Sequence, residues 1–117
     1  MRPSFSLVIM LLSILLSPSS SVALIKCNDI DGPMKPCIDW MTTGYMRTGV
    51  PPEACCNELF KLVSMGRNTG EKKAICECVK SEMQDLNIND IVAQSLPGRC
   101  QVKLSFPVTP KVDCSKI

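Results

Sequence analysis

Apolar residues recur at helical spacing in four successive stretches of the chain, and polar residues separate these stretches. The first predicted helix starts at Asn28 or Asp29, both suitable caps, and ends near Gly44. The apolar positions that define the four helical faces are, in chain order, Ile30, Met34, Ile38 and Met41; Leu59, Leu62 and Val63; Ile75, Val79, Met83 and Leu86; and Ile91, Val92 and Leu96.

Start and stop signals bound the other three helices. The second is predicted over about residues 53–64. Asn68 followed by Glu71 resembles a capping box and predicts the start of the third helix. Asn87 is expected to cap a short fourth helix, which the Pro97-Gly98 pair should end.

The C-terminal tail has a different pattern, in which apolar and polar residues alternate. Its apolar positions are Val102, Leu104, Phe106 and Val108. Prolines within and after this stretch argue against a regular strand, so we expect an extended segment that lays one apolar edge across the helices. The predicted fold class is therefore all-α: a four-helix bundle with an extended C-terminal arm.

The first 23 residues have the features of a secretory signal peptide. Arg2 precedes an apolar run over residues 7–16, and Ser21-Val22-Ala23 offers small residues for cleavage after Ala23. The run is too short to span a bilayer, which needs about 20 apolar residues. We therefore predict residues 1–23 as a leader, residues 24–117 as one folded domain, and a soluble, secreted product.

Charge and composition exclude several classes of function. Removing Arg2 from the 13 Lys and Arg residues leaves 12 against 11 Asp and Glu, which is no basic footprint for nucleic acid. The chain has no histidine, so Ser-His-Asp and Cys-His catalytic arrangements and imidazole metal sites cannot form. The acidic pairs Glu53/Glu58 and Glu82/Asp85 have the spacing of solvated helix faces. We expect no enzyme activity, no metal and no cofactor.

The eight cysteines are the most specific feature of the chain. They include an adjacent pair, Cys55-Cys56, and a Cys76-Glu77-Cys78 triplet. Neighbouring residues on a helix point about 100° apart, so the members of each group should reach different segments. A four-cysteine zinc site is the alternative, but a secretory leader favours four disulfides. Geometry alone leaves several pairings open.

The region from Cys27 to Cys114 resembles the plant non-specific lipid transfer proteins, and within them the type 1 group. The cysteine order C-x9-C-x17-CC-x19-CxC-x21-C-x13-C is that family's skeleton. Local strings agree with it: Pro36-Cys37-Ile38-Asp39, Val50-Pro51-Pro52 before Cys55-Cys56-Asn57, Leu96-Pro97-Gly98-Arg99-Cys100 and Asp113-Cys114-Ser115-Lys116. The polar residue Glu77 between Cys76 and Cys78 also fits type 1.

This resemblance implies four helices and an arm around a lengthwise hydrophobic tunnel that takes acyl chains. It implies the pairings Cys27–Cys78, Cys37–Cys55, Cys56–Cys100 and Cys76–Cys114. The expected partners are lipid monomers such as fatty acids, lysolipids and phospholipids, with transient membrane contact, for a monomeric protein. The residues expected to contact lipid are Ile30, Met34, Ile38, Met41, Leu62, Lys72, Ile75, Val79, Met83, Leu96, Val102, Leu104, Phe106 and Val108.

Two family motifs near the lipid head group are altered here. The basic residue of the first corresponds to Lys72, which offers an ammonium but cannot bind bidentately as arginine does. The tyrosine of the second corresponds to Phe106, which has no hydroxyl. The span from Cys37 to Cys55 is also longer than usual, which enlarges the loop at residues 43–50 and is expected to change a tunnel mouth.

Other interpretations remain open at this level. Each apolar position also fits a plain packed core, because packed interiors are the rule. The same cysteine scaffold suits an extracellular defence or signalling protein, although the small net charge does not favour direct membrane disruption. It also suits a hydrolase inhibitor, for which the loop at residues 43–50 is the candidate contact.

Overall fold

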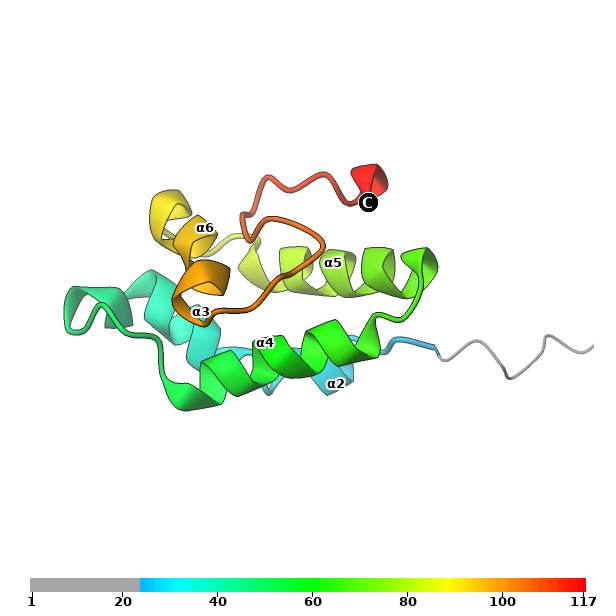
Figure 1. Cartoon of the computed structure of the whole chain (residues 1–117). Helices are drawn as coiled ribbons and strands as arrows, with labels where there is room; N and C mark the ends of the chain where they lie inside the picture. The colour runs from blue at the N-terminus through cyan, green and yellow to red at the C-terminus, as the bar shows by residue number, and fades with distance from the viewer. Residues whose placement is uncertain (1–23) are drawn as a thin grey trace, which may run out of the picture.

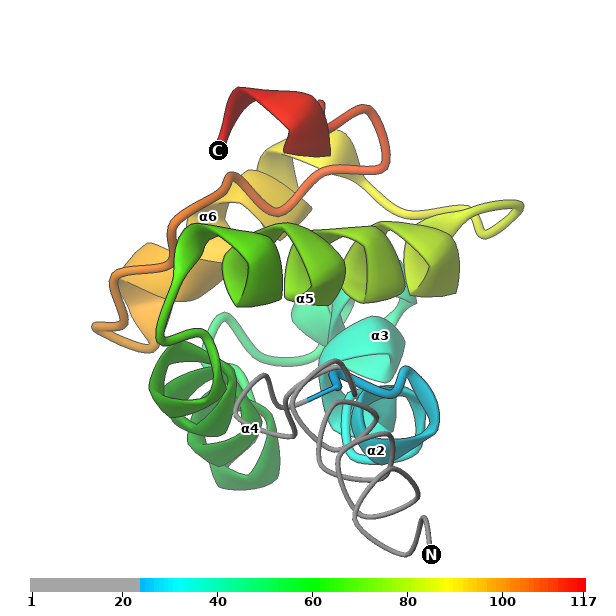
Figure 2. The ribbon, with the colours of Figure 1, turned by 90° about the vertical axis from the view of Figure 1, so that its right-hand side faces the viewer.

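The structure is a computed structural model that describes residues 24–117; the predicted leader lies outside the described residues. These residues contain helices and no strands, and the helices form a bundle closed by a C-terminal arm (Figures 1 and 2). In chain order the elements are α2 (Asn28–Asp31), α3 (Lys35–Thr42), the 3-10 helix η1 (Gly44–Met46), α4 (Glu53–Met65), α5 (Thr69–Met83), α6 (Asp90–Arg99) and the 3-10 helix η2 (Cys114–Lys116). None of the helices in this part combines the length and apolar character needed to cross a bilayer.

The two longest helices, α4 and α5, are joined by a short turn and run in opposite directions across Figure 1, while Figure 2 shows that they cross, with α4 nearly end-on and α5 seen from the side. The chain after α6 bends beside the turn that joins them and then runs back over α5 toward the C-terminus (Figures 1 and 2). Figure 2 shows the turn between α4 and α5 on the same side of the molecule as the first bend of this arm. The end of α4, the start of α5 and the arm therefore meet at one end of the bundle.

The first predicted helix is divided in two, which corrects the sequence-based boundary. α2 ends at Asp31, and α3 begins only at Lys35. Pro33 has no N–H to donate into a continuing helix. A turn therefore separates the two helices.

The predicted N-cap is correct for α5, whereas the N-cap of α6 is a different residue from the one predicted. The Asn68 side chain accepts a hydrogen bond from the Glu71 N–H (2.8 Å), as the capping box requires. The Glu71 carboxylate, however, accepts from the Arg67 N–H (3.0 Å). The cap of α6 is Asn89, two residues later than predicted, with its side chain accepting from Val92 N–H.

The end of α6 also differs from the prediction. The helix continues through Pro97 and Gly98 to Arg99 instead of ending before them. Pro97 lies in the last turn, so it removes only the bond that its own N–H would have made to the carbonyl of Ala93. The carbonyl of Pro97 accepts a hydrogen bond from the Val102 N–H (2.9 Å) at the start of the arm.

Burial supports most, but not all, of the predicted apolar faces. One residue of each of the last three helical patterns is largely exposed: Val63 (44%), Leu86 (44%) and Ile91 (82%). Leu86 lies beyond the end of α5, because the chain leaves the helix after Met83 and Asp85 has a positive φ of 62°. In α6 the buried position is Ala93 in place of Ile91.

The four disulfides have the pairings that the resemblance implied: Cys27–Cys78, Cys37–Cys55, Cys56–Cys100 and Cys76–Cys114. The adjacent cysteines of α4 reach α3 and the end of α6. Those of the triplet in α5 reach the N-terminal segment and the C-terminal end. All eight cysteines are thereby paired, which rules out the four-cysteine zinc site in this state.

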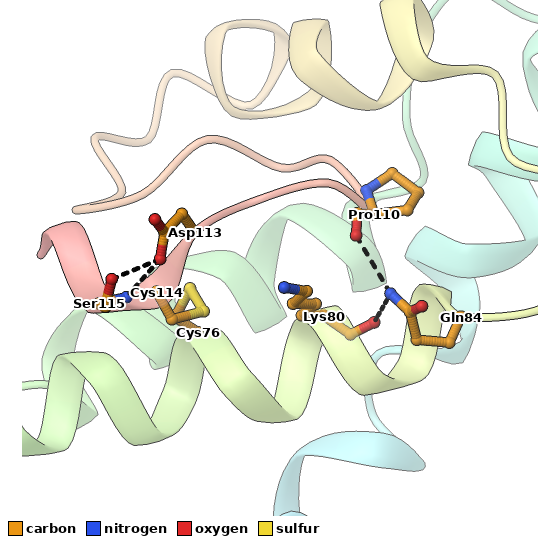
Figure 3. The surroundings of a disulfide bond; sticks show 7 residues. All are labelled: Cys76, Lys80, Gln84, Pro110, Asp113, Cys114 and Ser115. Atoms are coloured by element: carbon orange, nitrogen blue, oxygen red, sulfur yellow. Dashed lines mark hydrogen bonds between the residues drawn. A yellow bond between two sulfur atoms is a disulfide. The ribbon is translucent and has the colours of Figure 1, made fainter.

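The arm is extended without being a strand, as its prolines predicted. Val102, Phe106 and Val108 are buried, and Leu104 is half-buried against the core. Near the end of the arm, Gln84, which follows the last residue of α5, donates a hydrogen bond to the carbonyl of Pro110 (3.1 Å), and the Cys76–Cys114 bridge lies about two turns back along α5 (Figure 3).

The last turn, η2, is fixed by Asp113. Its carboxylate accepts hydrogen bonds from the Ser115 hydroxyl and from the Ser115 N–H, and both lower the pKa of Asp113 (Figure 3). Cys114, the first residue of this capped turn, is thereby held in position for its disulfide to α5. Together with Cys56–Cys100, the Cys76–Cys114 bridge holds the arm at both ends.

The enlarged loop between α3 and α4 is anchored by Trp40, which is almost fully buried. The indole N–H donates to the carbonyl of Thr48 (3.0 Å), and the ring meets Tyr45 edge-on. Arg99 of α6 lies 6.0 Å from the centre of the Trp40 ring and donates to the carbonyl of Gly49 (2.7 Å). The loop is therefore tied to two helices.

Glu58 departs from the expected solvated helix face. Its side chain is 7% exposed, and its Oε1 has no hydrogen-bond partner among the described residues. Burial raises the pKa of Glu58, although the charge of Lys61 partly opposes this. An unsatisfied buried polar group costs about 1–3 kcal/mol, so this carboxyl weakens the fold.

We expect Glu58→Met to raise the free energy of unfolding at pH 7 by about 1–2 kcal/mol. Since the folded-state pKa is raised, the penalty is absent at low pH and grows as the pH rises from the ordinary value of 4.5 through the raised pKa. The gain should therefore shrink at pH 4 when both proteins are unfolded with urea. Glu53→Met, at an exposed position in the same helix, is the control and should change little; an equal gain there would contradict the explanation.

Candidate functional site

A cavity of about 300 Å³ lies at the end of the bundle where α4, α5 and the arm meet. This volume is at the lower end of the range for small-molecule pockets. Its lining is mainly apolar, with polar groups from α5 and the arm. The lining residues are Leu62, Val63, Gly66, Lys72, Ile75, Lys103, Leu104, Ser105 and Phe106.

Leu62 and Ile75 form the inner wall, because each is 2% exposed and belongs to the core. Lys72, one turn before Ile75 on the same face of α5, is the basic residue that α5 contributes to the lining. Gly66 makes room for its stem: a Cβ at this position would lie 3.0 Å from Lys72 Cγ and 3.3 Å from Ile75 Cδ1. The absence of a side chain at residue 66 thus lets Lys72 lie close against the turn.

The arm supplies the other wall. Phe106 is buried with its ring against the core, and Leu104 is half-buried two residues earlier. Lys103 and Ser105 alternate with them, are exposed, and contribute polar groups to the same cavity. The cavity therefore has an apolar interior with two lysines, Lys72 and Lys103, and no acidic residue in its lining.

Five of the fourteen predicted lipid-contacting residues line this cavity: Leu62, Lys72, Ile75, Leu104 and Phe106. The other nine are not part of its lining, and they pack in or against the core: Ile30, Met34, Ile38, Met41, Val79, Met83, Leu96, Val102 and Val108. For these nine, contact with lipid stays a prediction.

Four lining residues were not predicted. Val63 was assigned to a buried face, and Gly66 lies just after the predicted end of the second helix. Lys103 and Ser105 are the polar positions of the alternating tail, where period-two spacing predicts exposure to solvent. Only the bend of the arm places them beside Lys72, so spacing alone gave no signal for them.

A second, larger hollow of about 770 Å³ lies on the outer side of α3 and the enlarged loop. None of the predicted lipid-contacting residues lines it. Lys35 and Asp39 in its wall neutralise each other as an exposed ion pair (3.1 Å). The loop was expected to alter a tunnel mouth, but Thr43, Arg47 and Thr48 line this hollow and not the cavity of about 300 Å³.

The lining of the cavity is suited to binding an apolar ligand. The lining combines hydrocarbon with the side chains of two lysines and one serine, and it contains no His, Asp or Glu. Within residues 24–117 no three His, Cys, Asp or Glu side chains are grouped to hold a metal ion. An apolar guest with a polar or anionic end matches this lining.

The fold and the cavity together define a small helical protein, held by four disulfides, with an apolar ligand site. The family model described as "Protease inhibitor/seed storage/LTP family" matches residues 22–114. The chain belongs to the plant non-specific lipid-transfer proteins within that family, and its cysteine pairing is the one implied for type 1.

Individual relatives support this assignment. The chain is 34% identical to non-specific lipid-transfer protein AP10 of Helianthus annuus over 80% of this chain and 77% of the relative. It is 31% identical to non-specific lipid-transfer protein 8 of Arabidopsis thaliana over 94% and 92%. It also resembles the solved structure of barley non-specific lipid transfer protein 1 in complex with a lysophosphatidylcholine (TM-score 0.67, 29% identity, 80% of this chain and 99% of that one).

Proposed function

We propose that this protein is a secreted carrier that holds the acyl chain of a fatty acid, lysolipid or phospholipid in its interior, without covalent chemistry. The observation that carries the proposal is the apolar cavity between α4, α5 and the arm, with Lys72 and Lys103 in its lining. A relative of the same fold has been solved with a lysophosphatidylcholine. The predicted leader supports an extracellular site of action.

Burial of hydrocarbon supplies the driving force. Each buried methylene contributes about 0.8 kcal/mol, so a long acyl chain binds without specific polar contacts. A chain that enters past Ile75 would extend among the core methionines Met34, Met41 and Met83, all of which are fully buried. Methionine adapts its shape easily, so we expect the interior to widen around guests of different length.

Displacement of a fluorescent fatty acid from the purified protein tests this proposal. We expect saturable binding, and displacement by unlabelled fatty acids and lysolipids. An interior that admits no such probe would contradict the carrier function and would favour a defence or inhibitor function on the same scaffold. Mass spectrometry of the natively purified protein would identify the bound lipid.

The head-group side of the site gives a sharper prediction. Lys72→Met removes the ammonium and keeps the aliphatic stem, so affinity for a fatty acid anion should fall by about three- to fivefold. Affinity for the corresponding fatty alcohol should not change, because it has no charge to pair. Titration of both ligands provides the measurement, with Lys73→Met as the control, since Lys73 is outside the cavity lining. Equal losses for acid and alcohol would show that Lys72 acts only through its stem.

A further inference from the structure

The outer face of α4 carries an apolar stripe that the cavity does not account for. Phe60 is 53% exposed, and Val63, one turn later, is 44% exposed. Residues three apart on a helix are neighbours on its surface. Val63 also lines the cavity, so the stripe runs from the surface of α4 to the opening of the ligand site. We call Phe60 and Val63 the α4 stripe.

The charged side chains next to the Val63 end of the α4 stripe are basic. Lys61 lies beside it on α4, and Lys72 and Lys103 line the adjoining cavity. Of the acidic side chains in α4 and the first turn of α5, Glu58 and Glu71 are buried, and Glu53, two turns before Phe60, is exposed. The exposed hydrocarbon of the stripe therefore adjoins lysine side chains at the cavity end of α4.

From this arrangement we propose that the α4 stripe is the surface by which the protein docks on an anionic lipid bilayer, with the cavity opening turned toward the membrane. This rests on the proposed carrier function. An exposed aromatic ring beside aliphatic and basic side chains has the composition of surfaces that lie in the bilayer interface. The lysines attract the anionic surface from solution. An acyl chain then passes from bilayer to cavity without crossing water, which a docking site elsewhere could not provide.

Other exposed apolar residues do not share this setting. Ile91 is more exposed than Phe60, at 82%, but it lies in the first turn of α6, away from the junction of α4 and α5 (Figure 1). Lys111 follows Pro110, whose carbonyl accepts a hydrogen bond from the Gln84 side chain. Gln84 comes just after the C-terminal end of α5, whereas Lys72 lies near the N-terminal end of that helix. Ile91 and Lys111 therefore provide matched controls.

Three measurements on each variant test the proposal: sedimentation with vesicles of phosphatidylcholine with and without phosphatidylglycerol, transfer of a fluorescent fatty acid between vesicles, and binding of that fatty acid in solution. Phe60→Ser should lower vesicle binding and transfer by about tenfold and leave binding in solution unchanged. Ile91→Ser should change none of them. Lys61→Gln should weaken binding only to vesicles with phosphatidylglycerol, in a salt-sensitive way, and Lys111→Gln should not.

A gain-of-signal variant reports insertion directly. Phe60→Trp adds an indole at the stripe, whereas Trp40 is only 2% exposed. Its emission should shift to the blue when anionic vesicles are added, and that of the unmodified protein should not. Unchanged transfer by Phe60→Ser, equal losses in Ile91→Ser, or loss of solution binding in Phe60→Ser would each overturn the docking surface. If the unmodified protein binds no fatty acid in solution, the carrier function itself is wrong, and this outcome is distinct from the others.

Discussion

Replacing Leu104 by arginine is expected to weaken the binding of a long-chain fatty acid by about a hundredfold. Leu104 lies on the arm, is half-buried, and lines the cavity opposite α4 and α5. An arginine there would fill part of the cavity and place a charge against hydrocarbon. Exclusion of about four methylenes of the ligand removes about 3 kcal/mol of binding free energy, which is about a hundredfold.

The fold should survive this change. Since Leu104 is only half-buried, the guanidinium can reach water while its stem covers apolar surface. Leu86→Arg is the matched control, because Leu86 is exposed and outside the cavity lining. Fatty-acid titration, with thermal unfolding of each variant, makes the measurement. Wild-type affinity in a folded Leu104→Arg protein would show that ligand enters elsewhere.

Removal of the Cys76–Cys114 bridge is expected to lower the free energy of unfolding by about 2–4 kcal/mol. The matched comparison is removal of Cys27–Cys78, the other bridge of α5. The two bridges join residues 38 and 51 positions apart. Because loop-closure entropy grows slowly with loop length, removing either bridge should relax the unfolded chain by nearly the same amount. Denaturant unfolding of the two double Cys→Ala variants tests this.

Ligand binding should distinguish these two variants. The arm is held at one end by Cys56–Cys100 and at the other by Cys76–Cys114. Without Cys76–Cys114, Leu104 and Phe106 lose part of their fixed position as a cavity wall. Fatty-acid affinity should therefore fall more in this variant than in the one lacking Cys27–Cys78. Equal affinities would mean that packing and hydrogen bonds alone hold the arm in place.

Local sequence signals predicted where helices form better than where they end. The cap at Asn68 was correct because a cap depends on residues three positions apart. The division at Pro33 and the continuation of α6 through Pro97 depend on how many backbone bonds each proline removes in its actual position, which periodicity does not measure. Ile91 has the apolar pattern of a core residue, yet α6 turns Ala93 inward instead.

The residues of the candidate site also divide into those that the sequence predicted and those that it did not. Lys72 and Phe106 were named from the family motifs, and both line the cavity. Lys103 and Ser105 were not predicted to line it, because the alternating pattern assigns them to the solvent-facing side of the arm and does not show which other segments lie there. Glu58 was assigned to a solvated face, because spacing along a helix does not reveal which neighbour covers it.

By itself the sequence determined the helical class, the extended arm and, through the resemblance of its cysteine order, all four disulfide pairings. These features follow from short-range periodicity and from a spacing of cysteines that is specific to one family. Only the tertiary structure decided where the cavity lies, which lysines reach it and that the α4 stripe stands exposed beside it. Those features depend on how segments distant in sequence approach one another, since a side chain is covered or left open by neighbours that its own local pattern does not contain.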